Sequence, residues 1–265
     1  MNAKEKQWQL EEDIKRMSSL CVAFSAGVDS TFLLASAKKA LGDKAIAVTV
    51  RSSMYMKREH KEAVAFTKKM GIKHIMLDAD EYSIKEFVEN GKERCYYCKY
   101  AIFSKIKEVA KKYGIEYVAD GSNLDDDNDF RPGMRAIKEL RVESPLKKVG
   151  LSKQEIRDLS KEMGLFTWDK PAFACLASRI PYGMPITREK LEMVEKAEEY
   201  LMDLGFKQFR VRHHGELARI EVLPDERRKF FDEQTLDDIT RAYKEIGFKY
   251  VTMDLEGYRM GSLNV

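Results

Sequence analysis

The sequence has no long apolar stretch and almost no excess charge. No run of about 18 apolar residues occurs in its 265 positions, which excludes an ordinary membrane-spanning helix. The chain has 47 basic and 44 acidic side chains, which gives a net charge of +3. The cationic surface of a dedicated nucleic-acid binder is therefore not indicated. Residues 1–16 have the pattern of a polar helix and lack the apolar core of a signal peptide. We therefore expect a cytoplasmic protein without membrane or nucleic-acid partners.

Two further scarcities narrow the chemistry. The chain lacks the pattern G-x-x-x-x-G-K-[ST], so it has no lysine-bearing loop that works on a γ-phosphate. It has only four cysteines, Cys21, Cys95, Cys98 and Cys175. In a reducing compartment such thiols are more often core, metal-binding or catalytic groups than disulfides. Hydrophobic residues still make up 44% of the chain, which is enough for a globular core and excludes a disordered protein.

The first part of the chain alternates short apolar runs with amphipathic helical patterns. Short runs rich in Val, Ile and Ala are typical of buried parallel strands. The predicted strands are residues 20–24, 45–50, 74–77 and 117–120, and the predicted crossover helices are residues 30–41, 58–70 and 97–113. This repeated βαβ pattern predicts an α/β fold with a doubly wound parallel sheet.

The rest of the chain predicts a second, smaller domain. A helix over residues 152–163 ends the first domain, and residues 167–187 form a proline-containing loop that is too long for a plain connection. Helices over 188–204 and 236–246, with strands over 206–212, 217–222 and 250–255, indicate a small α+β domain. We therefore predict domains at 1–166 and 188–265, joined by the loop 167–187.

The loop after the first strand has the features of a phosphate site. Six residues link that strand to the next helix: Ser25, Ala26, Gly27, Val28, Asp29 and Ser30. Their backbone N–H groups and the helix N-terminus favour an anion at this edge of the sheet. The segment resembles the S-G-G-x-D-S pyrophosphate loop of the ATP pyrophosphatase superfamily. The resemblance implies cleavage of ATP between its α and β phosphates, with Asp29 helping to hold magnesium.

One position departs from that pattern, because Ala26 stands where the superfamily has glycine. If the position needs a positive φ, the alanine is strained by roughly 1 kcal/mol, which does not abolish a site. The plain alternative is an ordinary strand-to-helix turn with a serine cap.

A second segment follows the strand at 117–120 and reaches the same sheet edge. Gly121 allows a close backbone approach to a nucleotide, and we assign Gly121 and Asn123 to the nucleotide site. The acidic run that continues through Asp129 can also be a solvated loop. Arg131 and Arg135 can bind phosphates or pair with its carboxylates.

Three cysteines form a second candidate site. Cys95 and Cys98 are three positions apart at the start of a predicted helix, where both thiols share a face. Cys175 lies in the long loop. A closed zinc site takes four Cys or His ligands, and no histidine has a matching spacing. Three thiolates suit a [4Fe–4S] cluster with one open iron. Redox or zinc chemistry and unrelated roles stay open, and Cys21 is expected in the core.

These motifs together resemble one family. The loop at 25–30, the segment G-S-N-L-D-D at 121–126 and especially P-A-F-A-C-L-A-S-R-I-P-Y-G at 171–183 are similar to LarE. LarE is the ATP-dependent sulfur transferase of nickel-pincer nucleotide synthesis. The resemblance implies that a carboxylate of pyridinium-3,5-biscarboxylic acid mononucleotide is adenylated and that sulfur at Cys175 then displaces AMP. In members with one cysteine at this place, that residue gives up its own sulfur and becomes dehydroalanine.

The two extra cysteines depart from that form. With Cys95 and Cys98 present, we interpret Cys175 as the third ligand of a [4Fe–4S] cluster that carries a sulfide on its open iron. Arg179 beside Cys175, and Arg210 and Arg212 on one strand face, are candidate ligands of the substrate phosphate. Their plain alternative is a role in salt bridges. The resemblance also implies that the C-terminal domain binds substrate between subunits of a homo-oligomer, whereas the sulfur donor is not indicated.

Three other functions fit parts of the pattern. A tRNA-thiolating enzyme would share the loop and the three cysteines, but it needs a basic docking surface. An amide-forming synthetase of the same superfamily would leave the cysteine loop unexplained. A non-catalytic nucleotide-binding module would bind ATP and release no pyrophosphate.

Overall fold

The computed structural model describes residues 1–128 and 132–259. The chain forms two compact units, Met1–Phe87 with Lys92–Ala172, and Val88–Gly91 with Phe173–Val265. The division between Ala172 and Phe173 falls inside the loop that we predicted as a linker. Among the described residues, no helix is long and apolar enough to cross a membrane.

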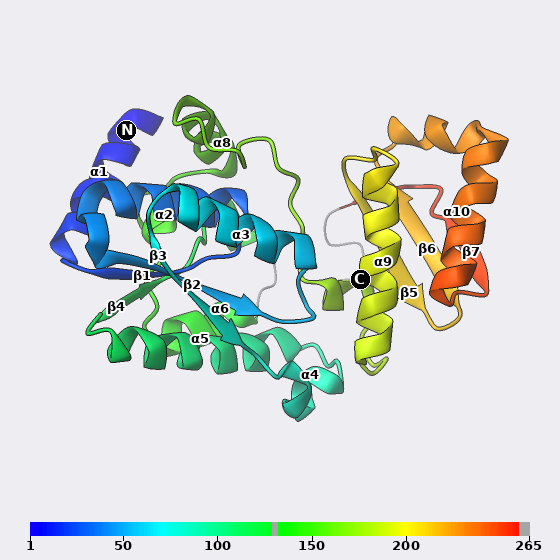
Figure 1. Cartoon of the computed structure of the whole chain (residues 1–265), viewed down its shortest axis with the longest axis horizontal. Coiled ribbons are helices and arrows are strands. Elements are labelled where there is room, and N and C mark those ends of the chain that lie inside the picture. Colours follow the sequence, from blue (N-terminus) through cyan, green and yellow to red (C-terminus); the bar gives the residue numbers. More distant parts are fainter. Residues whose placement is uncertain (129–131, 260–265) are drawn as a thin grey trace. The chain divides into compact units, whose positions relative to one another are not determined.

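The first unit is built on a four-stranded parallel sheet (Figure 1). Its strands run in the order β3-β2-β1-β4 and comprise β1 (Leu20–Ala23), β2 (Ala45–Arg51), β3 (Lys73–Asp78) and β4 (Tyr117–Ala119). The predicted α/β fold with a doubly wound parallel sheet is confirmed, and all four predicted strands are present to within one residue at each end.

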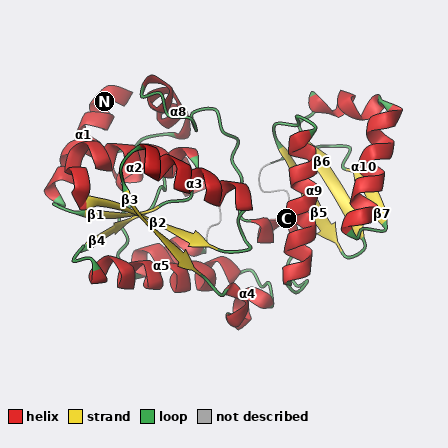
Figure 2. Ribbon diagram, in the orientation of Figure 1, coloured by secondary structure: helices red, strands yellow, loops and turns green. Residues whose placement is uncertain are grey.

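Helices cover both faces of this sheet (Figure 2). One face carries α1 (Ala3–Arg16), α2 (Val28–Leu41), α3 (Lys57–Lys69) and α8 (Lys153–Glu162), and the other carries α5 (Arg94–Lys112) and α6 (Gly133–Glu139). Two one-turn helices, α4 (Lys85–Val88) and α7 (Pro145–Lys148), are the remaining α-helices among the described residues up to 172. The sequence did not predict α4, α6 or α7, because segments of four to seven residues are too short to show helical periodicity.

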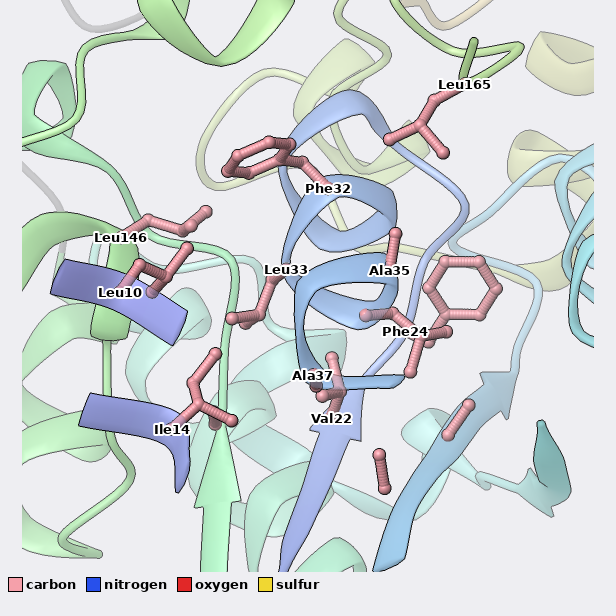
Figure 3. Close-up of a cluster of buried hydrophobic side chains, with 14 of the residues drawn as sticks. Leu10, Ile14, Val22, Phe24, Phe32, Leu33, Ala35, Ala37, Leu146 and Leu165 are labelled. Atoms are coloured by element: carbon pink, nitrogen blue, oxygen red, sulfur yellow. The ribbon is translucent and has the colours of Figure 1, made fainter. Parts of the chain in front are cut away.

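The alternation of side chains along β1 separates two cores. Leu20 and Val22 pack with α1, α2 and α8, and Figure 3 shows Val22 next to Ala37 of α2. Cys21 points to the opposite core, against α5. Burial raises the pKa of its thiol to about 12, so Cys21 is an inert core residue, as its position in the strand predicts.

The second unit is a small sheet covered by two long helices. It contains α9 (Arg188–Asp203), β5 (Phe209–His214), β6 (Leu217–Val222), α10 (Glu233–Ile246) and β7 (Tyr250–Met253). The strand order is β5-β6-β7, with an antiparallel first pair and a parallel second pair. The strand β5 begins three residues after the predicted start, because the amides of Lys207 and Gln208 donate to the Glu226 carboxylate outside the sheet.

Candidate active site

The phosphate loop, residues 25–30, lies at the carboxyl end of β1, an inner strand of the sheet. Ligands of open parallel sheets bind at this end of the strands. Gly27 is the N-cap of α2, and Ala26 is fully buried with a φ of 56°. The alanine at the superfamily's glycine position therefore does adopt the left-handed conformation. Its neighbours must hold it there, since this region disfavours a residue with a Cβ.

Two serine hydroxyls brace the loop from within. Ser30 Oγ lies 3.1 Å from Ser25 Oγ, accepts from the Ser25 amide at 3.3 Å and donates to the Gly27 carbonyl at 3.3 Å. The Gly27 amide donates to Ser25 Oγ at 3.4 Å. These contacts are long, so the same hydroxyls and amides can turn to an anion at the helix N-terminus.

The segment after β4 packs directly on the phosphate loop. A Cβ on Gly121 would lie 3.0 Å from the Ser30 backbone nitrogen and 3.3 Å from the Asp29 Cβ. What Gly121 approaches in this structure is the first turn of α2. Its assignment as a nucleotide contact stays a prediction, although it lines the same pocket.

Asp29, in the first turn of α2, is held by two side chains from other segments. Asn123 Nδ2 donates to its Oδ1 at 3.2 Å, and Lys153 Nζ donates to its Oδ2 at 2.5 Å. The sequence did not predict a role for Lys153 in the site, because it is one of many lysines and lies in no recognised motif. The only local signal is the capping box of Ser152 and Glu155, which places Lys153 at the first position of α8.

A pocket of about 300 Å³ opens beside the phosphate loop. Its polar end includes Ser25, Gly27, Asp29, Ser30 and Asp126, where carboxylate oxygens could ligate a hard cation such as magnesium. Its walls combine apolar residues of the sheet and α5 with polar groups: Val48, Val50, Ile102, Phe103, Ile106, Glu59, His60 and Lys99. The pocket thus joins an anion-binding end to an apolar slot, which is the combination that a nucleotide needs.

Cys95 and Cys98 lie in the first turns of α5, as predicted. Cys95 is exposed, whereas Cys98 is buried with its Sγ 3.5 Å from the Met54 Sδ. Within the described ranges, no group of three or more His, Cys, Asp and Glu side chains is arranged to hold a metal ion. Arg135, one of the candidate phosphate ligands, pairs with Glu93. Arg131 and Asp129 lie outside the described residues.

Cys175 lies in the second unit, on a loop held by a buried arginine. Arg179 is fully buried and bonds Glu198 through Nε and Nη2, both at 2.8 Å. Its Nη1 donates to the carbonyls of Ala174 and Cys175 at 2.6 and 3.0 Å. The guanidinium therefore fixes the backbone at Cys175, and contact of Arg179 with substrate stays a prediction.

The two strand arginines are buried as well. Arg212 bonds Glu221 through Nε and Nη2 at 2.9 and 2.8 Å. Arg210 donates to the Phe209 carbonyl and lies over the Tyr258 ring, with the guanidinium carbon 4.9 Å from the ring centroid. Burial, and next the charge of Arg179, lower the pKa of Arg210 to about 10. Arg210 is therefore still charged at neutral pH, as a phosphate ligand must be. The binding of a phosphate by Arg210 and Arg212 stays a prediction.

The chain is similar in sequence to several known proteins. A family model described as NAD synthase matches residues 6–106, from α1 into α5. An uncharacterized Synechocystis protein is 42% identical over 243 residues, 92% of this chain and 91% of that protein. The pyridinium-3,5-bisthiocarboxylic acid mononucleotide synthase of Lactiplantibacillus plantarum is 36% identical over 253 residues, 95% of this chain and 91% of the synthase. An uncharacterized Methanocaldococcus jannaschii protein is 30% identical over 250 residues, 94% of both chains.

The chain belongs to the LarE-like family of pyrophosphate-loop ATP pyrophosphatases. It is an ATP-dependent enzyme of that family, and the phosphate loop with its pocket is the candidate ATP site. The similarity to the L. plantarum synthase spans nearly the whole chain. The NAD synthase model matches only the part that contains the phosphate loop.

Proposed function

We propose that this protein is an ATP-dependent sulfur transferase of nickel-pincer nucleotide synthesis. Its substrate would be pyridinium-3,5-biscarboxylic acid mononucleotide, and its product a thiocarboxylate. The observation that carries the proposal is the left-handed phosphate loop around Asp29 in a chain 36% identical to the L. plantarum synthase along 95% of its length. The name of that relative supplies the product class, and the loop supplies the means of activating a carboxylate.

The first step would be adenylation of the substrate. A carboxylate oxygen attacks the α-phosphorus of ATP, the bond from that phosphorus to the bridging oxygen breaks, and pyrophosphate leaves. The amides of the phosphate loop and the N-terminus of α2 would stabilise the negative charge on the leaving group. Asp29 would help to hold magnesium. Lys153, whose Nζ donates to Asp29 Oδ2 at 2.5 Å, would supply positive charge for the leaving pyrophosphate.

The second step would replace AMP by sulfur. A sulfur nucleophile attacks the acyl carbon, the bond from that carbon to the AMP oxygen breaks, and AMP leaves as the weaker nucleophile. Arg179 would keep Cys175 in a fixed backbone geometry for this step through its bonds to the Ala174 and Cys175 carbonyls.

The transferred sulfur has two candidate sources, a cluster-bound sulfide and Cys175 itself. Thiolates are the protein ligands that iron–sulfur clusters take, and the exposed Cys95 and the Cys98 one turn later on α5 can supply two of them. Cys95, Cys98 and Cys175 would hold a [4Fe–4S] cluster, which when bound supplies an iron position for a sulfide. The alternative is that Cys175 donates its own sulfur and is left as dehydroalanine.

Iron counting separates these sources. Wild type, Cys95→Ala and Cys21→Ala, which alters only the core cysteine, are reconstituted anaerobically and assayed for iron and acid-labile sulfide. We expect four irons per chain in wild type and Cys21→Ala and a clear loss in Cys95→Ala. Equal iron content in all three would overturn the ligand role. An iron-free protein that turns over once and loses the mass of hydrogen sulfide would establish Cys175 as the sulfur source.

Pyrophosphate release tests the substrate. We expect the dicarboxylated pyridinium mononucleotide to stimulate release from ATP, and tRNA or ammonia to have no effect. Stimulation by tRNA would move the protein to the tRNA-thiolating enzymes. We further propose that Arg210 and Arg212 bind the substrate phosphate and that the protein works as a homo-oligomer. Arg210→Met should then raise the KM for the mononucleotide without changing the KM for ATP.

A further inference from the structure

Lys170 reaches the phosphate loop from a distant part of the sequence. Its Nζ donates to the Ala26 carbonyl at 3.1 Å and to Glu62 Oε2 at 2.7 Å, and it lies 3.4 Å from Glu59 Oε1. The side chain is 13% exposed. A lysine ammonium in such a position has its three hydrogens committed to three oxygen atoms.

The backbone that carries Lys170 is fixed to a helix. Arg157 of α8 donates from Nη1 to the Trp168 carbonyl and from Nη2 to the Lys170 carbonyl, both at 2.7 Å. The helix α8 in turn packs on the core that includes α2. Lys170 therefore extends from a rigid support, and its bond to Ala26 can transmit that rigidity to the loop.

The hydrogen bond from Lys170 is made to the peptide group between Ala26 and Gly27, which sets the direction of the Gly27 amide. Ala26 is the residue with a φ of 56°, and its carbonyl shares a planar trans peptide with the Gly27 amide. In such a peptide the C=O and N–H point in opposite directions. Holding the Ala26 carbonyl toward Lys170 therefore aims the Gly27 N–H away from it. Gly27 lines the pocket, so this amide is one of the donors available to a phosphate.

The charge of Lys170 has a second effect at the same place. Glu59 lines the nucleotide pocket, and Glu62 lies one turn later on α3. Without a cation, these two carboxylates would repel the triphosphate of ATP. Lys170 lies between them and the loop, and it offsets part of that charge.

We propose that Lys170 is a positioning residue for ATP binding, which holds the left-handed Ala26 peptide so that the Gly27 amide is preset for a phosphate. The inference rests on ATP binding at the phosphate loop, which is part of the proposed function, and it is independent of the sulfur step. It also gives a reason why this chain tolerates alanine at the superfamily's glycine position. A contact from outside the loop stabilises the conformation that glycine adopts freely.

Calorimetric titration of ATP and magnesium into the full-length protein tests the proposal without any carboxylate substrate. We expect Lys170→Met to weaken ATP binding about tenfold, because a charged hydrogen bond to the loop is lost. Lys170→Arg should stay within about threefold of wild type, since a guanidinium keeps the charge and the donors. Lys111→Met, at an exposed position near the end of α5, should bind ATP as wild type does.

A double-mutant cycle with Ala26→Gly identifies the mechanism. Glycine needs no help to adopt a positive φ, so Lys170→Met should cost less than about threefold in the Ala26→Gly protein. The same tenfold loss in both backgrounds, or no loss in either, would overturn the positioning role. Lys170→Met combined with Glu59→Gln and Glu62→Gln removes the repulsion. Full recovery of binding there would assign the effect to charge alone and also overturn the proposal.

Circular dichroism with urea titration checks that each variant is folded, and Lys170→Gln, which keeps a shorter donor, replaces Lys170→Met if that variant unfolds. The same cycle is then read with glutamine. A wild type that binds ATP but forms no thiocarboxylate would refute the proposed function and leave this inference in place.

Discussion

The Lys153 ammonium and the Asp29 carboxylate form an ion pair at the head of the phosphate loop, with 2.5 Å between Nζ and Oδ2. The pair is partly accessible, since the two side chains are 31% and 21% exposed. Asn123 holds the other carboxylate oxygen. Asp29 is therefore oriented before any nucleotide binds, and a magnesium ion would find one of its ligands already fixed.

Replacing Lys153 should separate binding from turnover. We expect Lys153→Met to lower the kcat for pyrophosphate release by about tenfold to a hundredfold, because a cation that neutralises the leaving group is lost. The KM for ATP should change by much less, since the loop amides still bind the triphosphate. Steady-state assays of pyrophosphate release measure both constants. Lys69→Met, an exposed lysine in the last turn of α3, is the control, and an equal kcat in the two variants would contradict this role.

A methyl group at Gly121 should disturb the phosphate loop at Asp29 and Ser30. Its Cβ would lie 3.0 Å from the Ser30 nitrogen, a contact with backbone that cannot rotate away. We expect Gly121→Ala to lower the free energy of unfolding by about 1–3 kcal/mol and to weaken ATP binding. Urea unfolding and calorimetry measure the two effects.

Gly91 offers the matched control for that substitution. A Cβ at Gly91 would meet no atom within 4 Å, and its φ is not in the left-handed region. Gly91→Ala should therefore change the free energy of unfolding by less than about 1 kcal/mol. Similar losses in both glycine variants would show that the contact with Ser30 is not the cause.

The sequence predicted the sheet and the loop because both depend on local pattern. Short apolar runs flanked by small-residue turns identify parallel strands, and strand order then brings the loops after β1 and β4 together. Contacts from single lysines leave no such pattern. Lys153 and Lys170 lie 124 and 144 positions from the loop residues that they contact, and nothing in their surroundings distinguishes them from the other lysines.

The same limit applies to the arginines. Arg210 and Arg212 were placed on one strand face by alternation, and the structure puts both in β5. Their burial depends on what covers that face, which alternation cannot reveal. Arg179 was chosen for its position next to Cys175, yet its partner Glu198 lies 19 positions later on α9. Sequence identified the charges, and only the fold identified their partners.

The Arg179–Glu198 pair should be essential for the stability of the second unit. Both side chains are fully buried, so Arg179→Met leaves a carboxylate without its cation, and we expect a loss of about 3–5 kcal/mol of unfolding free energy. Arg179→Met with Glu198→Gln should recover much of that loss, because glutamine is neutral and still accepts from the Val211 amide. Urea unfolding measures both, and no recovery in the double variant would show that the charge is not the cause.

Acid should weaken the packing beneath the phosphate loop through His74. Its Nε2 lies 2.8 Å from Thr49 Oγ1, and that hydroxyl donates to the Phe24 carbonyl next to Ser25. Burial lowers the pKa of His74, so between the lowered value and about 6.5 the unfolded chain binds a proton that the folded chain does not. Unfolding free energy must then fall as the pH decreases through this range, because protons favour the state that binds them.

His213 and His214 add to the same acid sensitivity, since burial lowers the pKa of each, so the test isolates one histidine. His74→Gln keeps a polar group near Thr49 and cannot titrate. We expect its urea midpoint, followed by circular dichroism, to fall less between about pH 7 and about pH 5 than that of wild type. Parallel pH profiles would mean that His74 has the same pKa in the folded and unfolded chains. The acid sensitivity would then have to come from other titratable groups, such as His213 and His214.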